Sequence, residues 1–168
     1  MRVGKISPAK LLERFTLPQL TNFYIFWMEY ALKLQRESLA DKMAKYQQDG
    51  TPVQHGTIEI YDMAGLSFSQ LNISALNALS SVLKIGQEHY PENLWKGFIV
   101  NAPVVFSATW KIIKPILHAN TQAKISVTSS SNVESLEPLY GASNIPTFLG
   151  GTDTTFPALD PKKDHLEV

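Results

Sequence analysis

The stretch Phe98-Ile99-Val100, followed directly by Asn101-Ala102-Pro103, decides the fold class of this 168-residue chain. Three consecutive apolar residues, two of them β-branched, predict a short strand that is apolar throughout. The proline three residues later ends the extended segment. What kind of sheet this strand joins depends on the segments before and after it.

Two other segments also have the composition of strands. Thr57-Ile58-Glu59-Ile60-Tyr61 is rich in β-branched residues, and Ile125 and Val127 alternate with polar residues. Helical periodicity fills the intervals, from about residue 72 or 74 to His89, from Ser107 to Leu117, and after residues 129–131. Strands that alternate with helices are typical of a parallel sheet with right-handed crossovers. The sequence therefore predicts an α/β fold.

A long helix is predicted ahead of the first strand, over residues 18–48. Apolar and aromatic side chains recur in it at three- and four-residue steps, at Leu20, Phe23, Tyr24, Trp27, Tyr30, Ala31 and Leu34. Gly50 and Pro52 close the segment. We expect this aromatic stripe to pack in the core; a cofactor-binding face is the alternative.

Composition limits the classes of function. Lys plus Arg and Asp plus Glu number 15 each, so no net charge attracts nucleic acid or an anionic membrane. The absence of cysteine excludes disulfides, thiol catalysis and thiolate metal sites. The first ten residues do not have the pattern of a targeting segment. We expect a cytoplasmic monomer without a metal or cofactor, and no nucleic-acid partner.

The common catalytic motifs are not found in the sequence. Gly65-Leu66-Ser67-Phe68-Ser69 follows a strand and is similar to a nucleophile elbow, but Ser69 stands where the second glycine is needed. The four histidines are scattered rather than placed at metal-binding spacings. The glycine-rich phosphate-binding motifs do not occur. We therefore expect that the chain is not an enzyme.

A set of short motifs between residues 57 and 151 occurs in a fixed order. They are Ile58-Glu59-Ile60-Tyr61-Asp62 with Gly65, Tyr90-Pro91-Glu92, Lys96 to Pro103, Phe106-Ser107, Lys114-Pro115-Ile116-Leu117, Thr121 with Lys124, and Ile145 to Gly151. In order and spacing they resemble the motifs of the Sec14-like, or CRAL-TRIO, family of lipid-binding proteins. Residues 1–56 match this family more loosely, as the long helix before the first strand.

The resemblance implies a single domain whose parallel sheet floors a hydrophobic lipid pocket. The lipid-binding core would span residues 57–151, after an N-terminal part over 1–56 and before a C-terminal tail over 152–168. The family's first strand and N-terminal helical lobe are expected to be missing here. The sheet should then have an exposed or differently paired edge.

The family covers its pocket with a movable helical segment, which corresponds to about Phe106 to Asn120 and is called the gate segment below. Its candidate pocket residues are Phe106, Trp110, Ile113, Ile116 and Leu117. Pro115 weakens the last turn of this segment. Such a helix would cover lipid when closed and touch a membrane when open. An ordinary buried crossover helix is the alternative.

Glu92, Thr121 and Lys124 stand at the positions with which family members hold a phosphatidylinositol headgroup. A lysine gives a charge-assisted hydrogen bond to phosphate, a threonine adds a neutral donor, and a carboxylate accepts bonds from sugar hydroxyls. Each residue also has a structural explanation when it is taken alone. Lys124 is then a solvated cation at a strand end, Thr121 a helix cap or turn residue, and Glu92 the first residue after a proline that ends a helix.

A second headgroup position involves Thr57 and Glu59. Members that hold phosphatidylcholine have two hydroxyl residues there, and Glu59 replaces one of them. A carboxylate would repel the lipid phosphate, which makes phosphatidylcholine doubtful and favours phosphatidylinositol.

The expected function is therefore the binding and transfer, or presentation, of a phospholipid during transient peripheral contact with membranes. A carrier of a tocopherol, retinoid or sterol is one alternative, although a neutral ligand would leave a buried lysine without a partner. A lipid-sensing regulatory or scaffold module is another.

Overall fold

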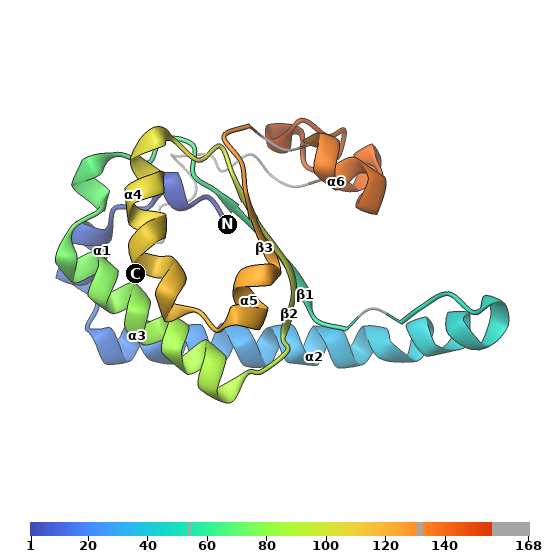
Figure 1. The fold of residues 1–168 in the computed structure, drawn as a ribbon. Coiled ribbons are helices and arrows are strands. Elements are labelled where there is room, and N and C mark those ends of the chain that lie inside the picture. Colours follow the sequence, from blue (N-terminus) through green and yellow to red (C-terminus); the bar gives the residue numbers. More distant parts are fainter. Residues whose placement is uncertain (54, 131–132, 156–168) are drawn as a thin grey trace.

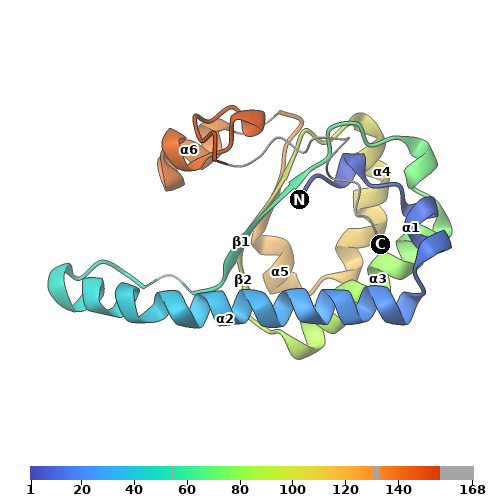
Figure 2. The same ribbon diagram turned by 180° about the vertical axis from the view of Figure 1, so that it is seen from behind.

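The computed structural model describes residues 1–53, 55–130 and 133–155. Its sheet has three parallel strands in the order β1-β2-β3, namely β1 (Thr57–Asp62), β2 (Leu94–Val100) and β3 (Ile125–Val127). Helices connect the strands, as Figures 1 and 2 show from opposite sides. The predicted α/β class with a parallel sheet is confirmed.

The helices follow the predicted order. They are α1 (Pro8–Arg14), α2 (Leu17–Asp49), α3 (Ile73–His89), α4 (Val104–Ile113), α5 (Ala119–Ala123) and α6 (Val133–Tyr140), with short 3-10 turns η1 (Val3–Lys5), η2 (Phe68–Gln70), η3 (Lys114–Ile116), η4 (Ala142–Asn144) and η5 (Thr147–Leu149). The helix expected over residues 107–117 is divided, because Pro115 lies in η3 rather than at the end of α4. The sequence did not predict α1 and α5, which are too short to show a helical period.

Helix α2 begins and ends with strong local signals. The Thr16 side chain accepts a hydrogen bond from the Gln19 backbone, and the Gln19 side chain accepts one from the Thr16 backbone, which forms a capping box. Gly50 ends the helix with a left-handed φ of 73°, which glycine adopts without a steric penalty. The helix predicted over residues 18–48 agrees with α2 to within one residue at each end; Gly50 was the signal for its end, whereas the capping box at Thr16 was not recognised in the sequence.

Strand β2 separates two groups of buried side chains. Phe98 and Val100 pack with Leu136, Ile145 and Leu149, from α6 and the segment after it. Ile99 belongs to a second cluster, whose other buried members are Met63 and Phe106 of α4. Figure 1 shows α6 on one side of the sheet and α3, α4 and α5 on the other. Both faces of the sheet are therefore covered.

The edge of β1 is bridged by the first residues of the chain. Arg2 pairs with Asp62 as an isolated parallel bridge, and the Asp62 backbone N–H donates to the Met1 carbonyl at 2.8 Å. The Met1 amine donates to the Ile60 carbonyl. The sheet edge that was expected to lack a strand is thus partly paired along the second half of β1.

The carboxyl ends of β1 and β2 are fastened to each other. The buried Asp62 carboxylate accepts hydrogen bonds from the Asn101 side-chain amide at 2.9 Å and from the Ala64 N–H at 3.0 Å. Asn101 has a left-handed φ of 52°, a conformation that asparagine tolerates better than most residues. These motif residues therefore have a structural role.

The prediction that the aromatic stripe of α2 packs in the core is wrong for most of its members. Phe23, Trp27, Tyr30 and Leu34 are exposed, and Leu20, Tyr24 and Ala31 are partly buried. Helix α2 instead turns its buried Met28 inward and contacts α3, where the Tyr24 hydroxyl leaves no room for a side chain at Gly86. Apolar residues surround more than half of α2, so periodicity alone did not identify the inner face.

Replacing Leu136 with alanine should lower the free energy of unfolding by about 2–5 kcal/mol, because it opens a cavity in the cluster beneath α6. The Leu136 side chain is 0% exposed, whereas Leu139 on the same helix is 42% exposed. Urea unfolding followed by circular dichroism measures both variants. Equal losses in Leu136→Ala and Leu139→Ala would contradict this account of α6.

Candidate functional site

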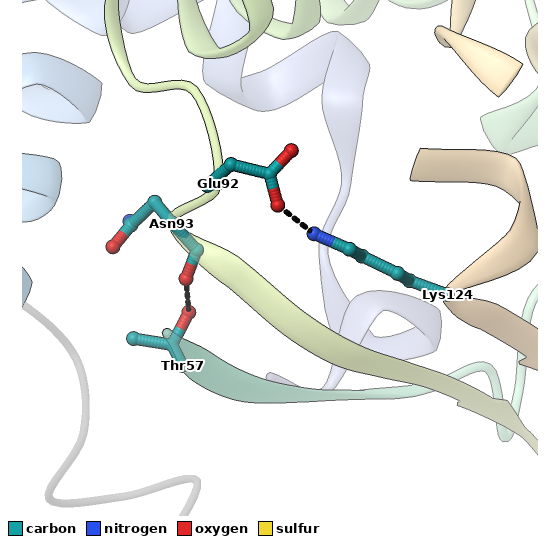
Figure 3. A network of polar contacts seen from close by, with 4 residues as sticks. All are labelled: Thr57, Glu92, Asn93 and Lys124. Atoms are coloured by element: carbon teal, nitrogen blue, oxygen red, sulfur yellow. Dashed lines mark hydrogen bonds and ion pairs between the residues drawn. The ribbon is translucent and has the colours of Figure 1, made fainter. Parts of the chain in front are cut away.

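Four polar residues gather at the amino ends of the three strands. Thr57 is the first residue of β1, Glu92 and Asn93 directly precede β2, and Lys124 directly precedes β3. Figure 3 shows the Glu92 and Lys124 side chains pointing toward one another and the Thr57 hydroxyl directed at the Asn93 carbonyl. The parallel sheet brings these residues together, because strands that run in one direction begin at one edge.

The Lys124 ammonium and the Glu92 carboxylate form an ion pair, with 2.6 Å between Nζ and Oε2. The Lys124 side chain is 27% exposed and that of Glu92 is 73% exposed. The lysine stem is thus largely covered while its charged end reaches a solvated carboxylate. An exposed pair of this kind adds little stability, so another anion can displace the carboxylate at small cost.

Glu92 occupies an unfavourable backbone conformation, with a left-handed φ of 58°. Such a conformation costs a residue with a Cβ about 1–2 kcal/mol. The turn persists because its next residue is held on several sides. Asn93 accepts hydrogen bonds from the Gln35 side chain of α2 and, through its carbonyl, from the Thr57 hydroxyl at 3.0 Å. The contacts of Asn93 therefore hold this strained turn in place.

Thr121 lies one helical turn before Lys124 in the short helix α5. The Lys124 N–H donates to the Thr121 carbonyl at 3.1 Å, and both side chains are partly buried. The structure thus places the three predicted headgroup residues close to the start of β3, with Glu92 and Lys124 in direct contact.

The predicted pocket residues of the gate segment are all at least partly removed from solvent. Phe106, Ile113 and Leu117 are buried, and Trp110 and Ile116 are partly buried. The Phe106 and Trp110 rings stack with their centroids 6.0 Å apart, in the cluster that contains Ile99. The beginning of α4 therefore packs against the sheet through Phe106.

Sequence analysis missed Gln87, which fastens the end of the gate segment to α3. Its side-chain amide donates to the Ile116 carbonyl at 2.9 Å, and its carbonyl oxygen accepts from the His118 N–H. One glutamine near a helix end gives no motif from which this contact could be inferred. Asn93 was missed for the same reason.

The second predicted position is a small hydroxyl and carboxylate cluster. The Glu59 carboxylate accepts hydrogen bonds from the Tyr61 hydroxyl and from the Thr57 hydroxyl, the latter at 3.4 Å. Burial, then the Glu59 carboxylate and Tyr90, raises the pKa of Tyr24 to about 12. Burial and Glu59 also raise the pKa of Tyr61 well above its usual value. The two tyrosines were not predicted as neighbours of Glu59.

Stability should fall as the pH rises from about 10 to about 12. An unfolded chain ionises Tyr24 near pH 10, whereas the folded chain retains that proton to about pH 12, so ionisation stabilises the unfolded state relative to the folded one in this window. Urea midpoints measured across the window should fall less steeply in Tyr24→Phe than in the parent. An equal slope in the two proteins would show that Tyr24 titrates normally.

Glu92→Gly should be more stable than Glu92→Ala by about 1 kcal/mol, because glycine adopts a positive φ without a Cβ clash. Both variants lose the carboxylate and its ion pair with Lys124, so their difference isolates the backbone term. Thermal or urea unfolding of the two variants measures it. Equal stabilities would mean that the turn at Glu92 is unstrained.

Within the part of the chain that the structure describes, His, Asp and Glu side chains do not gather in groups of three that could hold a metal ion. The described helices also include none with the length and hydrophobicity that a membrane span requires.

Comparison with known proteins gives matches over nearly the whole chain. The family model for the CRAL/TRIO domain matches residues 1–151, so the match begins well before residue 57. Phosphatidylinositol/phosphatidylcholine transfer protein SFH7 of Arabidopsis thaliana is 31% identical over 153 residues, which cover 91% of this chain and 27% of that protein. The corresponding protein SFH14 is 32% identical, over 89% of this chain and 25% of its own length.

Two further proteins are similar over different lengths. SEC14 cytosolic factor of Eremothecium gossypii is 36% identical over 92 residues, which cover 55% of this chain and 30% of that protein. The crystal structure of Sfh5 superimposes with a TM-score of 0.67 at 22% identity, over 92% of this chain and 48% of that one. This chain therefore has the fold of Sfh5 and spans roughly a quarter of the length of the transfer proteins that it matches.

Proposed function

This chain belongs to the CRAL/TRIO domain family, and from that premise we propose that it binds one phospholipid, most favourably phosphatidylinositol, and transfers or presents it between membranes. The Lys124–Glu92 ion pair at the amino edge of the sheet is the observation that carries this proposal. It offers a cation for a phosphate and an acceptor for hydroxyl groups at one place.

Binding of the headgroup would exchange the partners of this pair. The lipid phosphate takes the Lys124 ammonium from Glu92, and the Thr121 hydroxyl adds a donor from one helical turn away. The released Glu92 carboxylate accepts hydrogen bonds from the inositol hydroxyls. Because the 2.6 Å pair is largely solvated on the Glu92 side, the exchange costs little.

The acyl chains need an apolar environment that excludes water, as the interior of a bilayer does. Two chains hold about 30 methylene groups, which cost on the order of 24 kcal/mol if left in water. We propose that they lie between the sheet and the gate segment, whose residues Phe106 and Ile113 are buried in this structure. The gate segment therefore has to move away from the sheet to admit lipid, and in doing so it turns Trp110 and its neighbours toward a membrane.

The cluster around Glu59 supports phosphatidylinositol over phosphatidylcholine. Its carboxylate is partly buried and already accepts hydrogen bonds from Thr57 and Tyr61, so a phosphate beside it would meet a negative charge of low solvation. The two relatives from Arabidopsis thaliana are named for both lipids. The preference for phosphatidylinositol over phosphatidylcholine is our proposal for this chain alone.

A carrier of a neutral ligand or a regulatory module is less well supported, since Lys124 and Glu92 would then have no ligand group to contact. We propose a carrier that carries out no catalysis and works in the cytoplasm with transient contact at membrane surfaces. A related protein is named a cytosolic factor.

Lys124→Ala should reduce the capture of phosphatidylinositol by about tenfold or more, because a charge-assisted bond to phosphate is lost. Glu92→Gln should weaken the same lipid less, since an amide still offers one acceptor. Native mass spectrometry after incubation with mixed phosphatidylinositol and phosphatidylcholine vesicles measures occupancy directly.

Lys84→Ala is the matched control for this experiment. Lys84 forms an exposed ion pair with Glu88 at 3.7 Å, so its removal deletes the same charge away from the site. Equal phosphatidylinositol capture by Lys124→Ala and Lys84→Ala would refute the headgroup assignment. A folded parent chain that captures no phospholipid would refute the proposed function itself.

A further inference from the structure

Helix α2 presents an exposed row of large apolar side chains that the proposed function does not use. The row consists of Phe23, Phe26, Trp27, Tyr30 and Leu34, which are between 44% and 68% exposed. Fully buried aromatic side chains remove about 150–250 Å² each from water, so the row leaves about 500 Å² of apolar surface in solvent. A continuous patch of this size is toward the upper end of the largest apolar patches found on monomeric proteins, and such patches often have a function.

The row is a connected and accessible surface. The Phe26 and Tyr30 rings stack with centroids 6.4 Å apart, and the Trp27 and Tyr30 centroids are 6.1 Å apart. Helix α2 runs along one margin of the molecule in both views (Figures 1 and 2), and its other side contacts α3. The described elements of this chain therefore leave the row open.

The spacing of the row matches the surface of a second helix. Four of its five members, Phe23, Trp27, Tyr30 and Leu34, follow one another at alternating steps of four and three residues, as the contact positions of a two-helix coiled coil do, and the partly buried Leu20 precedes Phe23 by a further three. The same repeat continues into Glu37 and then Asp41. A partner must therefore accept apolar residues in the middle and acidic ones at one end.

We propose that the occupant is a second copy of this chain, whose α2 packs antiparallel against the row. In this register Trp27 of each copy faces Tyr30 of the other, and Phe23 faces Leu34. Asp41 then lies beside Thr16, the N-cap of the other copy's α2, and Glu37 lies beside Leu20. The interface is symmetric, as contacts between identical subunits usually are.

Charge selects the antiparallel arrangement. The first turn of α2 contains no acidic residue of its own that would interact with the helix dipole. An antiparallel second copy brings Asp41 to that positive end, together with Glu37, which is paired with Lys33 of its own helix at 3.8 Å. A parallel pair would instead place Glu37 against Glu37 and Asp41 against Asp41, which repel each other.

The buried area is sufficient for a reversible dimer. Two rows together bury about 1,000 Å², at the lower limit of specific protein interfaces, so we expect a dissociation constant in the micromolar range. This differs from the monomer expected from the sequence. The inference does not rest on lipid binding.

Sedimentation velocity of the whole chain, from about 1 to about 200 μM, tests the proposal. The parent should change from monomer to dimer across this range, and Trp27→Glu should raise the dissociation constant about a hundredfold or more. Phe68→Glu is the matched control, because Phe68 is 80% exposed in η2 and lies outside the row. It should dimerise as the parent does, and circular dichroism checks that each variant is folded.

A parent that stays monomeric at every concentration overturns the proposal, and so does a folded Trp27→Glu variant that dimerises normally. Flotation with phosphatidylcholine and phosphatidylserine vesicles identifies the competing occupant. If the parent is monomeric and Trp27→Glu, but not Phe68→Glu, loses flotation, the row binds a bilayer and the dimer is rejected.

Cross-linking tests the orientation, since the chain contains no native cysteine. Phe23→Cys mixed with Leu34→Cys should form a disulfide between the two variants, whereas each variant alone should not. In the antiparallel register, residue 23 lies about 16 Å along the axis from residue 23 of the other copy, too far for a disulfide. Efficient cross-linking of Phe23→Cys with itself would overturn the antiparallel arrangement.

Discussion

The side chains of Phe98, Ile99 and Val100 leave β2 on alternate faces, and both faces are covered by other parts of the chain. Phe98 and Val100 require the cover that α6 and the segment after it provide, while Ile99 requires α4. Because β2 is the central strand, its burial also fixes the positions of β1 and β3 beside it. A polar substitution at any of these three positions would therefore disturb one core or the other.

The location of the site follows from how the two edges of the sheet are used. Ligands of open parallel sheets usually bind beyond the carboxyl ends of the strands. Here that edge is closed by the buried Asp62 carboxylate and the Asn101 amide. The amino edge instead collects Glu92 and Lys124, whose side chains remain able to change partners. The structural contact between Asp62 and Asn101 and the exchangeable contact between Glu92 and Lys124 thus lie at opposite edges of the sheet.

Much of the fold could be predicted because its signals are local. Runs of β-branched residues mark β1 and the end of β2, and Thr16 and Gly50 mark the ends of α2. Motif order also predicted that Glu92 and Lys124 lie close together, although they are 32 positions apart in the sequence. Such a pairing requires knowledge of how the strands align, which the spacing of a known family supplies.

What could not be predicted depends on contacts that leave no pattern in the sequence. Helices α1 and α5 are shorter than two full helical periods, and Gln87 acts through two hydrogen bonds to a distant backbone. The aromatic stripe shows a different limit. Periodicity established that α2 has an apolar face, but Met28 on another side of the helix is the residue that is buried.

The contact made by Gln87 differs in electrostatic character from the contact between Glu92 and Lys124. The end of the gate segment is held to α3 by a neutral amide, through the Ile116 carbonyl and the His118 N–H. Glu92 and Lys124, the proposed headgroup residues, are by contrast held by opposite charges. Ionic strength weakens the second contact through screening and leaves the first almost unchanged. The proposed cover and the proposed headgroup pair are therefore held by contacts that respond differently to salt, so a change in ionic strength would act on one and hardly on the other.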